Sequence, residues 1–140
     1  MIPVFKPLIS KQGINEVIAT LKSGWWGQGP KVEEFEKGFA KFVGAKYAVA
    51  TNSCTAALDI AVRLVDFKNP VTVPALTFVS SALAPLNAGY RVKFVDINEN
   101  TLCADYADII VHYGGNLAGE GIVHDMAHCG GAKHKNPISC

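Results

Sequence analysis

The 140-residue chain is 49% hydrophobic and 18% charged, which is the composition of one folded domain and excludes intrinsic disorder. Its 13 Lys and Arg residues nearly balance 12 Asp and Glu residues, so no net charge favours nucleic acid or another polyanion as a partner. No apolar run reaches the roughly 18 residues of a membrane-spanning helix, and the first residues lack the pattern of a secretion signal, so we expect a soluble cytoplasmic protein with no membrane partner.

Two amphipathic helices are predicted within the first 44 residues. Ser10 is a suitable N-cap for the first helix, and Gly24 suits the position that follows its end. Pro30 suits the first turn of the second helix, which ends at Gly44. Apolar residues recur at helical spacing and are expected to face inward: Ile14, Val17, Ile18 and Leu21, then Val32, Phe35, Phe39, Phe42 and Val43.

From residue 45 the pattern changes to alternating strands and helices. Short apolar segments predict strands at 47–51, 71–73, 91–96, 108–111 and 121–124, with helices after the turn at 52–55 and over 78–87. This alternation predicts an α/β three-layer sandwich with a mostly parallel sheet. We expect a single partial domain over 1–140, with N-terminal helices in 1–44 and the sheet region in 45–140.

Two connections between the later strands are unusually short. Segments 97–105 and 113–120 have no helical stripe, and each has fewer residues than the dozen or more of a helical crossover. Either one face of the sheet lacks its covering helices, or these strands do not pair in parallel. An uncovered face would leave apolar surface exposed and favour association.

Two segments that follow strands are candidate ligand contacts. In the turn at 52–55, free N–H groups at a helix start beside the hydroxyls of Ser53 and Thr55 suit a phosphate, although the same residues are common as ordinary N-caps. Phe78 follows the strand at 71–73 and suits stacking on a planar ligand at the carboxyl ends of the strands. Core packing is the alternative for this residue.

The segment 124–128 combines acidic and imidazole side chains after the last apolar strand. Asp125 is costly to bury without a partner, so one hypothesis is a carboxylate aimed at a cationic ligand nitrogen with His128 nearby. The other is a zinc site through His124 and His128, a loose form of the H-E-x-x-H motif with Asp in place of Glu. His134, Cys129 and Cys140 could supply further zinc ligands, although their spacing matches no standard zinc-binding motif. All four cysteines are expected to be reduced thiols.

The glycine-rich loop between the first two helices carries Trp25, Trp26 and Gln28. Its two indole rings suit stacking on a sugar or a base, which makes these three residues candidate substrate contacts. The alternative is a hydrophobic clasp that closes the two helices on each other.

The segments 24–30, 43–58, 73–80, 95–97, 111–115 and 125–128, taken in this order, resemble the DegT/DnrJ/StrS aminotransferases. These are fold-type-I enzymes that use pyridoxal 5'-phosphate to aminate keto-sugars on nucleotide carriers. The resemblance covers essentially the whole chain and implies a truncated, shortened large domain of that fold. It also implies a nucleotide-sugar substrate, an amino-acid amino donor, and either a homodimer or a complementing second fragment.

The resemblance assigns roles to the candidate residues. It implies that Ser53, Cys54 and Thr55 lie near the cofactor phosphate and that Phe78 stacks on the cofactor ring. By the same resemblance Asp125 pairs with the pyridine nitrogen and His128 lies beside the ring.

The catalytic lysine of the family has no counterpart in the sequence. By resemblance, the lysine that forms the Schiff base lies just beyond Cys140, and Lys133 and Lys135 follow Asp125 too closely to replace it. No catalytic residue is therefore assigned. Two functions remain open: an aminotransferase that needs a second chain for the lysine, and a non-catalytic remnant or cofactor-binding fragment.

Overall fold

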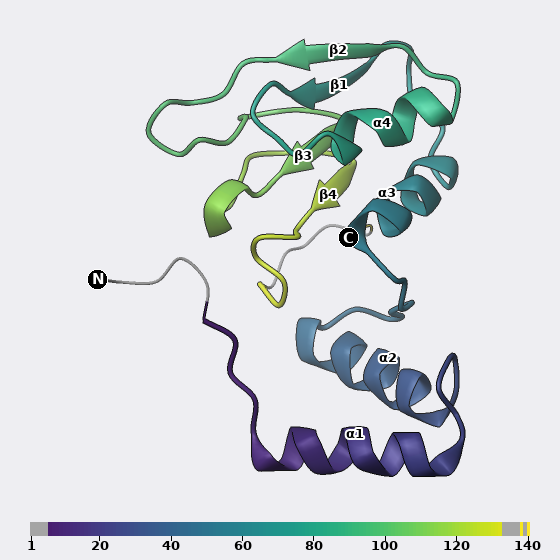
Figure 1. Ribbon diagram of the computed structural model, residues 1–140. Coiled ribbons are helices and arrows are strands. Elements are labelled where there is room, and N and C mark those ends of the chain that lie inside the picture. Colours follow the sequence, from purple (N-terminus) through teal and green to yellow (C-terminus); the bar gives the residue numbers. More distant parts are fainter. Residues whose placement is uncertain (1–5, 133–137, 139) are drawn as a thin grey trace.

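The computed structural model describes residues 6–132, 138 and 140 (Figure 1). None of the described helices is long and apolar enough to cross a membrane. The elements follow the order α1 (Lys11–Ser23), α2 (Pro30–Val43), α3 (Cys54–Arg63), β1 (Val71–Pro74), α4 (Ser80–Asn87), β2 (Val92–Val95), β3 (Ile109–Val111), a 3-10 turn (Tyr113–Gly115) and β4 (Val123–Asp125).

Helices α1 and α2 begin and end where the sequence predicts. The Ser10 hydroxyl accepts the Gly13 N–H at 3.0 Å, and Gly24 ends α1 in the left-handed conformation at φ 77°. Pro30 opens α2, and Gly44 ends it at φ 78°. These bounds depend on local backbone chemistry, which explains why the sequence was sufficient to predict them.

The predicted inward faces of α1 and α2 are wrong. No residue of α1 is buried, and Ala40 is the only buried residue of α2. Ile18 is 44% exposed and Phe42 62% exposed. The reason is tertiary, because the two helices lie apart from the sheet and from α3 and α4 (Figure 1). Their apolar stripes are therefore largely exposed to solvent.

The strands pair in parallel, as predicted. Val71 of β1 is opposite Val92 of β2, and Ile109 of β3 is opposite Val123 of β4. The two pairs are joined by side chains rather than by a backbone ladder. The Thr72 amide and hydroxyl both donate to Asp108 Oδ2, at 2.7 and 2.6 Å, and the Asp108 amide donates to the Thr72 hydroxyl at 2.8 Å. The strands consequently lie side by side in the order β2, β1, β3, β4 (Figure 1).

The last described residues extend this layer beyond β4. The His124 amide donates to the Ile138 carbonyl, the Cys140 amide to the His124 carbonyl, and the Met126 amide to the Cys140 carbonyl. Bonds that alternate in this way are those of a parallel neighbour. β4 is therefore an inner element of the layer and not its edge.

The strand predicted at 47–51 does not form. Tyr47 and Val49 are 75% and 76% exposed, and the segment is irregular. A strand needs a neighbour that satisfies its backbone groups, and within the described residues the Ala50 N–H bonds instead to a side chain, Glu36 Oε1 at 2.8 Å. The apolar alternation of this segment therefore remains without a sheet.

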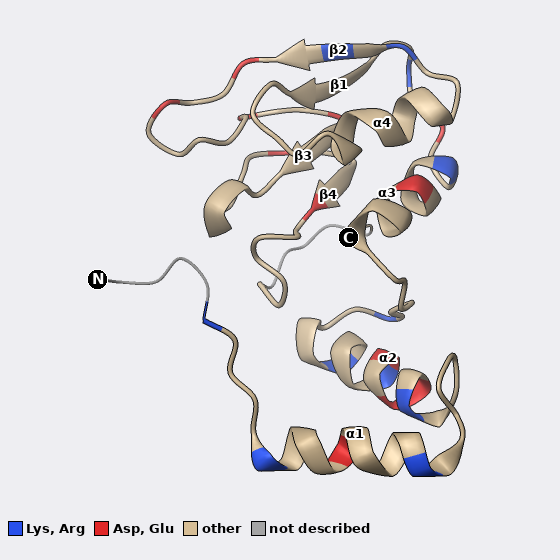
Figure 2. Cartoon of the chain, viewed as in Figure 1, with Lys and Arg blue, Asp and Glu red and all other residues tan. Residues whose placement is uncertain are grey.

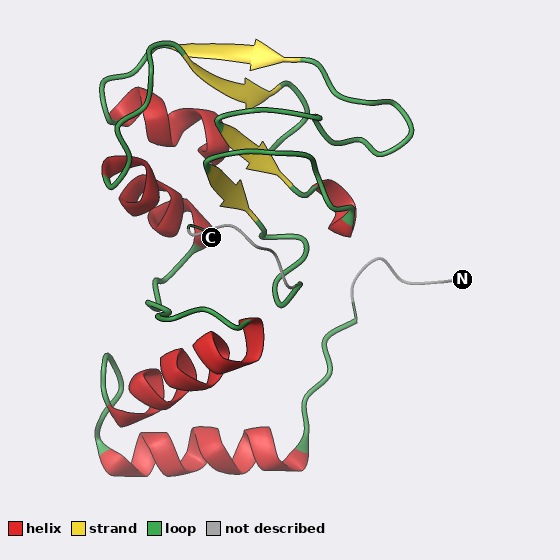
Figure 3. Cartoon of the chain, turned by 180° about the vertical axis from the view of Figure 1, so that it is seen from behind, coloured by secondary structure: helices red, strands yellow, loops and turns green. Residues whose placement is uncertain are grey.

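One face of the sheet is covered by α3 and α4, and the core lies between these helices and the strands. Its buried members include Leu58, Val62, Val71, Val73, Ile109 and Val123. The connections after β2 and β3 contain no α-helix, only loops and the 3-10 turn (Figure 3). The predicted shortage of covering helices is confirmed, whereas the alternative that these strands do not pair in parallel is wrong.

The two short connections pack closely against each other. The Gly119 N–H donates to the Ala104 carbonyl at 3.1 Å, and the Glu120 N–H to the Asp105 carbonyl at 3.0 Å. A Cβ at Gly119 would overlap the Asp105 carbonyl. Ala104 and Ala107 form a small second core with Ile110. The small residues thus allow the two connections to pack closely as loops, without helices.

Candidate functional site

A small pocket lies at the carboxyl ends of the strands, where open parallel sheets bind ligands. Its lining residues end or follow β1, β3 and β4: Thr77, Phe78, Val111, Tyr113, Asp125, Ala127 and His128. The fold therefore brings together three residues that the sequence pointed to, Phe78, Asp125 and His128.

Asp125 is the buried charge of this pocket, only 5% exposed. Its Oδ2 accepts the Ser81 hydroxyl at 2.8 Å, and its Oδ1 accepts the Ala127 N–H at 3.2 Å and the Cys54 thiol at 3.6 Å. All three partners donate, which is the pattern that an ionised carboxylate satisfies. None of the ion pairs found between described residues involves Asp125, the acidic end of β4 in Figure 2. Within the described part of the chain, this buried carboxylate therefore has hydrogen-bond donors but no cationic partner.

The start of α3 lies next to the carboxylate. Ser53 is the N-cap and accepts the Ala56 N–H at 3.2 Å. The N–H groups of Cys54 and Thr55 come earlier in the helix and have no acceptor among the described residues. Because the Cys54 thiol contacts Asp125, this helix start and the pocket form one continuous site.

The thiols around Asp125 are poor nucleophiles. Burial, and after it the Asp125 charge, raise the pKa of Cys54 to about 12 and that of Cys140 to about 11. The same two causes raise the pKa of Cys129. The four cysteines are free thiols. Cys54 therefore acts here as a neutral hydrogen-bond donor.

The two rings of the pocket are accessible. Phe78 is 70% exposed, so core packing does not describe it. His128 lies edge-on to Tyr113, with ring centroids 5.4 Å apart, and its Nδ1 accepts the Gly114 N–H at 3.1 Å. A neutral His128 therefore carries its proton on Nε2.

The zinc hypothesis does not fit the geometry of His124. The Ala118 N–H donates to His112 Nδ1, so His112 Nε2 carries the proton and donates to His124 Nδ1 at 2.8 Å. His124 Nε2 is then the donor to the Gly121 carbonyl. His124 thus offers no lone pair to a metal, and no group of three or more metal-ligating side chains occurs in the described part of the chain. His134, named above as a further ligand, lies outside that part.

Trp25, Trp26 and Gln28 do not line the pocket at Asp125. The Trp26 Nε1 donates to the Leu21 carbonyl at 2.9 Å, and the Trp25 ring lies against Gly29. Both contacts fasten the loop to itself and to the end of α1. Trp25 and Trp26 are nevertheless 61% and 76% exposed.

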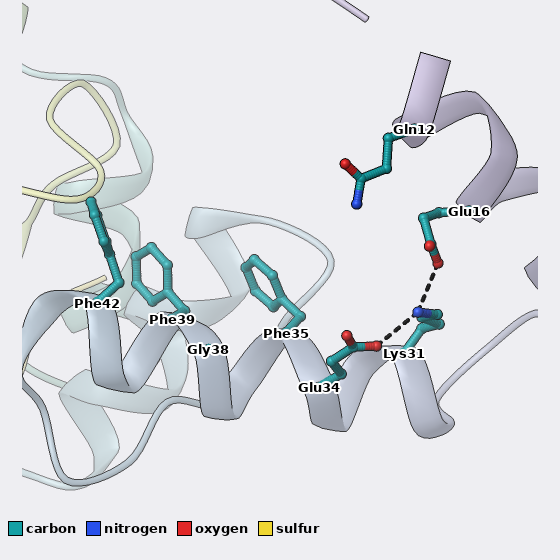
Figure 4. Close-up of a pocket in the computed structure, with 8 residues that line it drawn as sticks. All are labelled: Gln12, Glu16, Lys31, Glu34, Phe35, Gly38, Phe39 and Phe42. Carbon is teal, nitrogen blue, oxygen red and sulfur yellow. Dashed lines mark hydrogen bonds and ion pairs between the residues drawn. The ribbon is translucent and has the colours of Figure 1, made fainter. Parts of the chain in front are cut away.

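A larger open hollow of about 520 Å³ lies between α1 and α2 (Figure 4). Helix α1 contributes Gln12 and Glu16, and α2 contributes Lys31, Glu34 and the rings of Phe35, Phe39 and Phe42. Lys31 Nζ bonds to Glu16 and Glu34 at 2.7 and 2.8 Å. Its one lysine is paired with two carboxylates, and all three side chains are exposed at the surface, so no charge of this hollow is buried. We therefore place the candidate site at Asp125.

Sequence reasoning missed Thr77, Ser81 and Tyr113. Ser81 follows Phe78 by three residues, and the burial of Ala84 and Pro85 on the next turn of α4 shows which face of that helix meets the sheet. No signal in the sequence separates Ser81 from Ser80, because both serines are buried in the first turn of α4.

Comparison with known proteins identifies relatives of this arrangement. A profile of the DegT/DnrJ/EryC1/StrS aminotransferase family matches residues 7–118. SpsC, a spore coat polysaccharide biosynthesis protein of Bacillus subtilis (strain 168), is 45% identical over 128 residues, which covers 81% of this chain and 33% of SpsC. The dTDP-4-dehydro-2,3,6-trideoxy-D-glucose 4-aminotransferase of Saccharopolyspora spinosa is 30% identical over 132 residues, which covers 83% of this chain and 34% of that enzyme.

Solved structures show the same fold. Spr1654 from Streptococcus pneumoniae, in its PMP form, matches with a TM-score of 0.73 and 30% identity, covering 84% of this chain and 33% of Spr1654. Its PLP form matches with a TM-score of 0.72. The chain thus spans about one third of the length of these relatives. The alignment with SpsC has 128 positions, but 81% of this 140-residue chain is fewer residues than that. The alignment therefore contains gaps in this chain, where SpsC has additional residues.

Proposed function

We propose, from the premise that this chain belongs to the DegT/DnrJ/EryC1/StrS aminotransferase family, that it forms the cofactor-binding part of a sugar aminotransferase that uses pyridoxal 5'-phosphate. The observation that carries this proposal is the buried Asp125 carboxylate, which has no cationic partner among the described residues and lines a pocket with Phe78 and His128. When bound, the cofactor supplies an electron sink for a carbanion at the substrate carbon.

The side chains fit the parts of this cofactor. Asp125 accepts the hydrogen bond of the protonated ring nitrogen, and its negative charge keeps that proton in place. Phe78 has an exposed ring that stacks on the cofactor ring. His128 lies beside the ring, with its Nε2 proton as a donor.

The phosphate is held at the start of α3. The N–H groups of Cys54 and Thr55 lie there without an acceptor among the described residues, at the positive end of the helix dipole, and Ser53 and Thr55 carry hydroxyls in the same turn. The helix start and the Asp125 carboxylate, linked by the Cys54 thiol, belong to one site. A group that binds an anion beside a group that binds a cation suits a ligand that carries both a phosphate and a cationic ring.

The names of the relatives support a substrate class for this chain. We propose a keto-sugar on a nucleotide carrier as substrate and an amino acid as amino donor, in cell-surface polysaccharide or amino-sugar biosynthesis. SpsC and the dTDP-sugar 4-aminotransferase support this class by their names. Trp25, Trp26 and Gln28 are the candidate sugar or base contacts, because their loop carries two exposed indole rings.

We propose that these 140 residues form a single partial domain and that the lysine that holds the cofactor covalently comes from polypeptide outside them. The support is that the chain spans one third of SpsC. Lys133 and Lys135 lie outside the described residues. A homodimer or a complementing fragment would also cover the exposed apolar stripes of α1 and α2.

Titration of the purified chain with pyridoxal 5'-phosphate and pyridoxamine 5'-phosphate tests the proposal. We expect reversible binding, seen in the absorbance of the cofactor. Asp125→Asn should weaken binding about tenfold or more, because a charge-assisted hydrogen bond contributes roughly 1.5–3 kcal/mol. Asp59→Asn is the matched control, because Asp59 is paired with Arg63 on the surface of α3.

Three outcomes contradict the proposal. Absence of binding by the unaltered chain would favour the non-catalytic remnant. Unchanged affinity in Asp125→Asn would remove Asp125 from the site. A pyridoxyl adduct on Lys133 or Lys135 after borohydride reduction, detected by mass spectrometry, would show that the chain supplies its own lysine.

A further inference from the structure

We propose that Ser81 is a positioning residue: its buried hydroxyl, itself held by Thr77, fixes the Asp125 carboxylate in the orientation that meets a cationic ring nitrogen. This inference rests on the proposed function and extends it to a residue outside the pocket lining. Ser81 does not touch the ligand, so its effect passes entirely through Asp125.

The hydroxyl protons of Ser81 and Thr77 fix the direction of the hydrogen bonds that lead to Asp125. The Ser81 side chain is completely buried, and its Oγ lies 2.8 Å from Asp125 Oδ2 and 2.8 Å from Thr77 Oγ1. The carboxylate can only accept, so the single Ser81 proton points to Asp125. Thr77 must then donate to Ser81. A chain of two hydroxyls runs from the pocket wall, where Thr77 lies, to the carboxylate.

Ser81 makes the shortest contact that Asp125 has among the described residues. The other oxygen is held by the Ala127 N–H at 3.2 Å and by the Cys54 thiol at 3.6 Å, a weak donor. Ala127 is only two residues away along the chain and therefore moves with Asp125. Ser81 is the strong donor that lies on a separate element, the first turn of α4.

The helix holds Ser81 in place. Its neighbours on the same face, Ala84 and Pro85, are buried against the sheet, so the hydroxyl cannot follow the carboxylate if the latter rotates. Without this hydroxyl, Asp125 Oδ2 has no hydrogen-bond donor among the described residues, and only the two weaker contacts of Oδ1 then hold the side chain in its rotamer. A rotated carboxylate meets the ring nitrogen at a poorer angle.

Ser80 offers a matched control. It is adjacent in α4 and 6% exposed, and no hydrogen bond joins its hydroxyl to another described residue. Ser80→Ala therefore removes a buried hydroxyl from the same turn without touching Asp125. Ser81→Thr is the conservative variant, because it keeps the hydroxyl.

The experiment measures the dissociation constants of two ligands by titration: pyridoxamine 5'-phosphate and its 1-deaza analogue, in which carbon replaces the ring nitrogen. Neither ligand has an aldehyde, so neither reacts with lysine. We expect Ser81→Ala to weaken the binding of pyridoxamine phosphate about three- to tenfold and to change the dissociation constant of the deaza analogue by less than about twofold. Ser81→Thr should restore the affinity, and Ser80→Ala should change neither constant. Thr77→Val should produce a smaller loss in the same direction.

A second readout needs no ligand. Three-bond couplings in the ligand-free chain report whether the Asp125 side chain keeps one rotamer, and we expect averaging in Ser81→Ala alone. The role of Ser81 would be overturned if Ser81→Ala lost affinity for both ligands to the same extent, or if its Asp125 side chain kept one rotamer. If the unaltered chain binds both ligands equally or binds neither, the proposed function fails instead, while the couplings still decide whether Ser81 holds Asp125.

Discussion

Thr72 and Asp108 join the two halves of the sheet. The amide and the hydroxyl of Thr72 donate to the same Asp108 oxygen at 2.7 and 2.6 Å, and the Asp108 amide donates back to the Thr72 hydroxyl. β1 leads to Phe78 and β3 pairs with β4, which ends at Asp125. This junction therefore sets the distance between the two halves of the candidate site.

Thr72→Val should destabilise the fold. Valine keeps the shape but removes the hydroxyl, which leaves the Asp108 carboxylate and amide with fewer partners at a cost of about 1–3 kcal/mol. Urea unfolding followed by circular dichroism measures this loss. Thr72→Ser keeps both bonds and should stay close to the unaltered chain, so equal losses in the two variants would contradict the role of the hydroxyl.

Gly119→Ala should also destabilise the chain. The added Cβ would overlap the Asp105 carbonyl, and because both partners are backbone, the loops must separate, at about 1–3 kcal/mol for an overpacked site. Gly38→Ala in α2 is the control, because a Cβ there meets nothing within 4 Å. That variant should gain about 0.5–1 kcal/mol from helix propensity, and a loss in it would contradict our account.

The thiols of Cys54 and Cys140 should react slowly with iodoacetamide at pH 9. In the unfolded chain the thiols titrate near 9.0, whereas in the folded chain their pKa values are raised to about 12 and about 11. The thiolate fraction at pH 9 is therefore small in the native protein and large in urea. Peptide mapping after alkylation measures the difference. Equal labelling rates in the two conditions would contradict these pKa shifts.

The raised pKa values of Cys54 and Cys140 also predict that the folded chain loses stability at alkaline pH. Below the ordinary thiol pKa of 9.0 both states are protonated, and the thiols cause no pH dependence. Above it the unfolded chain loses protons first, so stability falls as the pH rises from about 9 toward 12. Cys54→Ala should flatten this slope in urea unfolding.

The exposed stripes of α1 and α2 should cause association. Sedimentation at micromolar concentration should show species larger than the monomer, because adjacent apolar faces of this size are rare on monomers. Replacing Ile18 and Phe35, which are 44% and 58% exposed, with Lys should shift the chain toward the monomer without loss of helix signal. A monomeric unaltered chain that binds no hydrophobic dye would contradict this expectation.

Much of the local structure followed from the sequence alone. Ser10, Gly24 and Gly44 set the helix bounds through capping, and apolar runs located β1 through β4, because both signals act over a few residues. Phe78, Asp125 and His128, which the sequence singled out, line one pocket because the carboxyl ends of parallel strands share one edge of the sheet.

The tertiary structure decided what each pattern packs against. The segment at 47–51 has the alternation of a strand but no neighbour to complete its hydrogen bonds, and the stripe of α1 has helical spacing but no surface to cover it. The contacts of Asp125 with Ser81 and Cys54 join residues 44 and 71 positions apart. Such pairings depend on how α3 and α4 pack on the sheet, and no local pattern in the sequence encodes that packing.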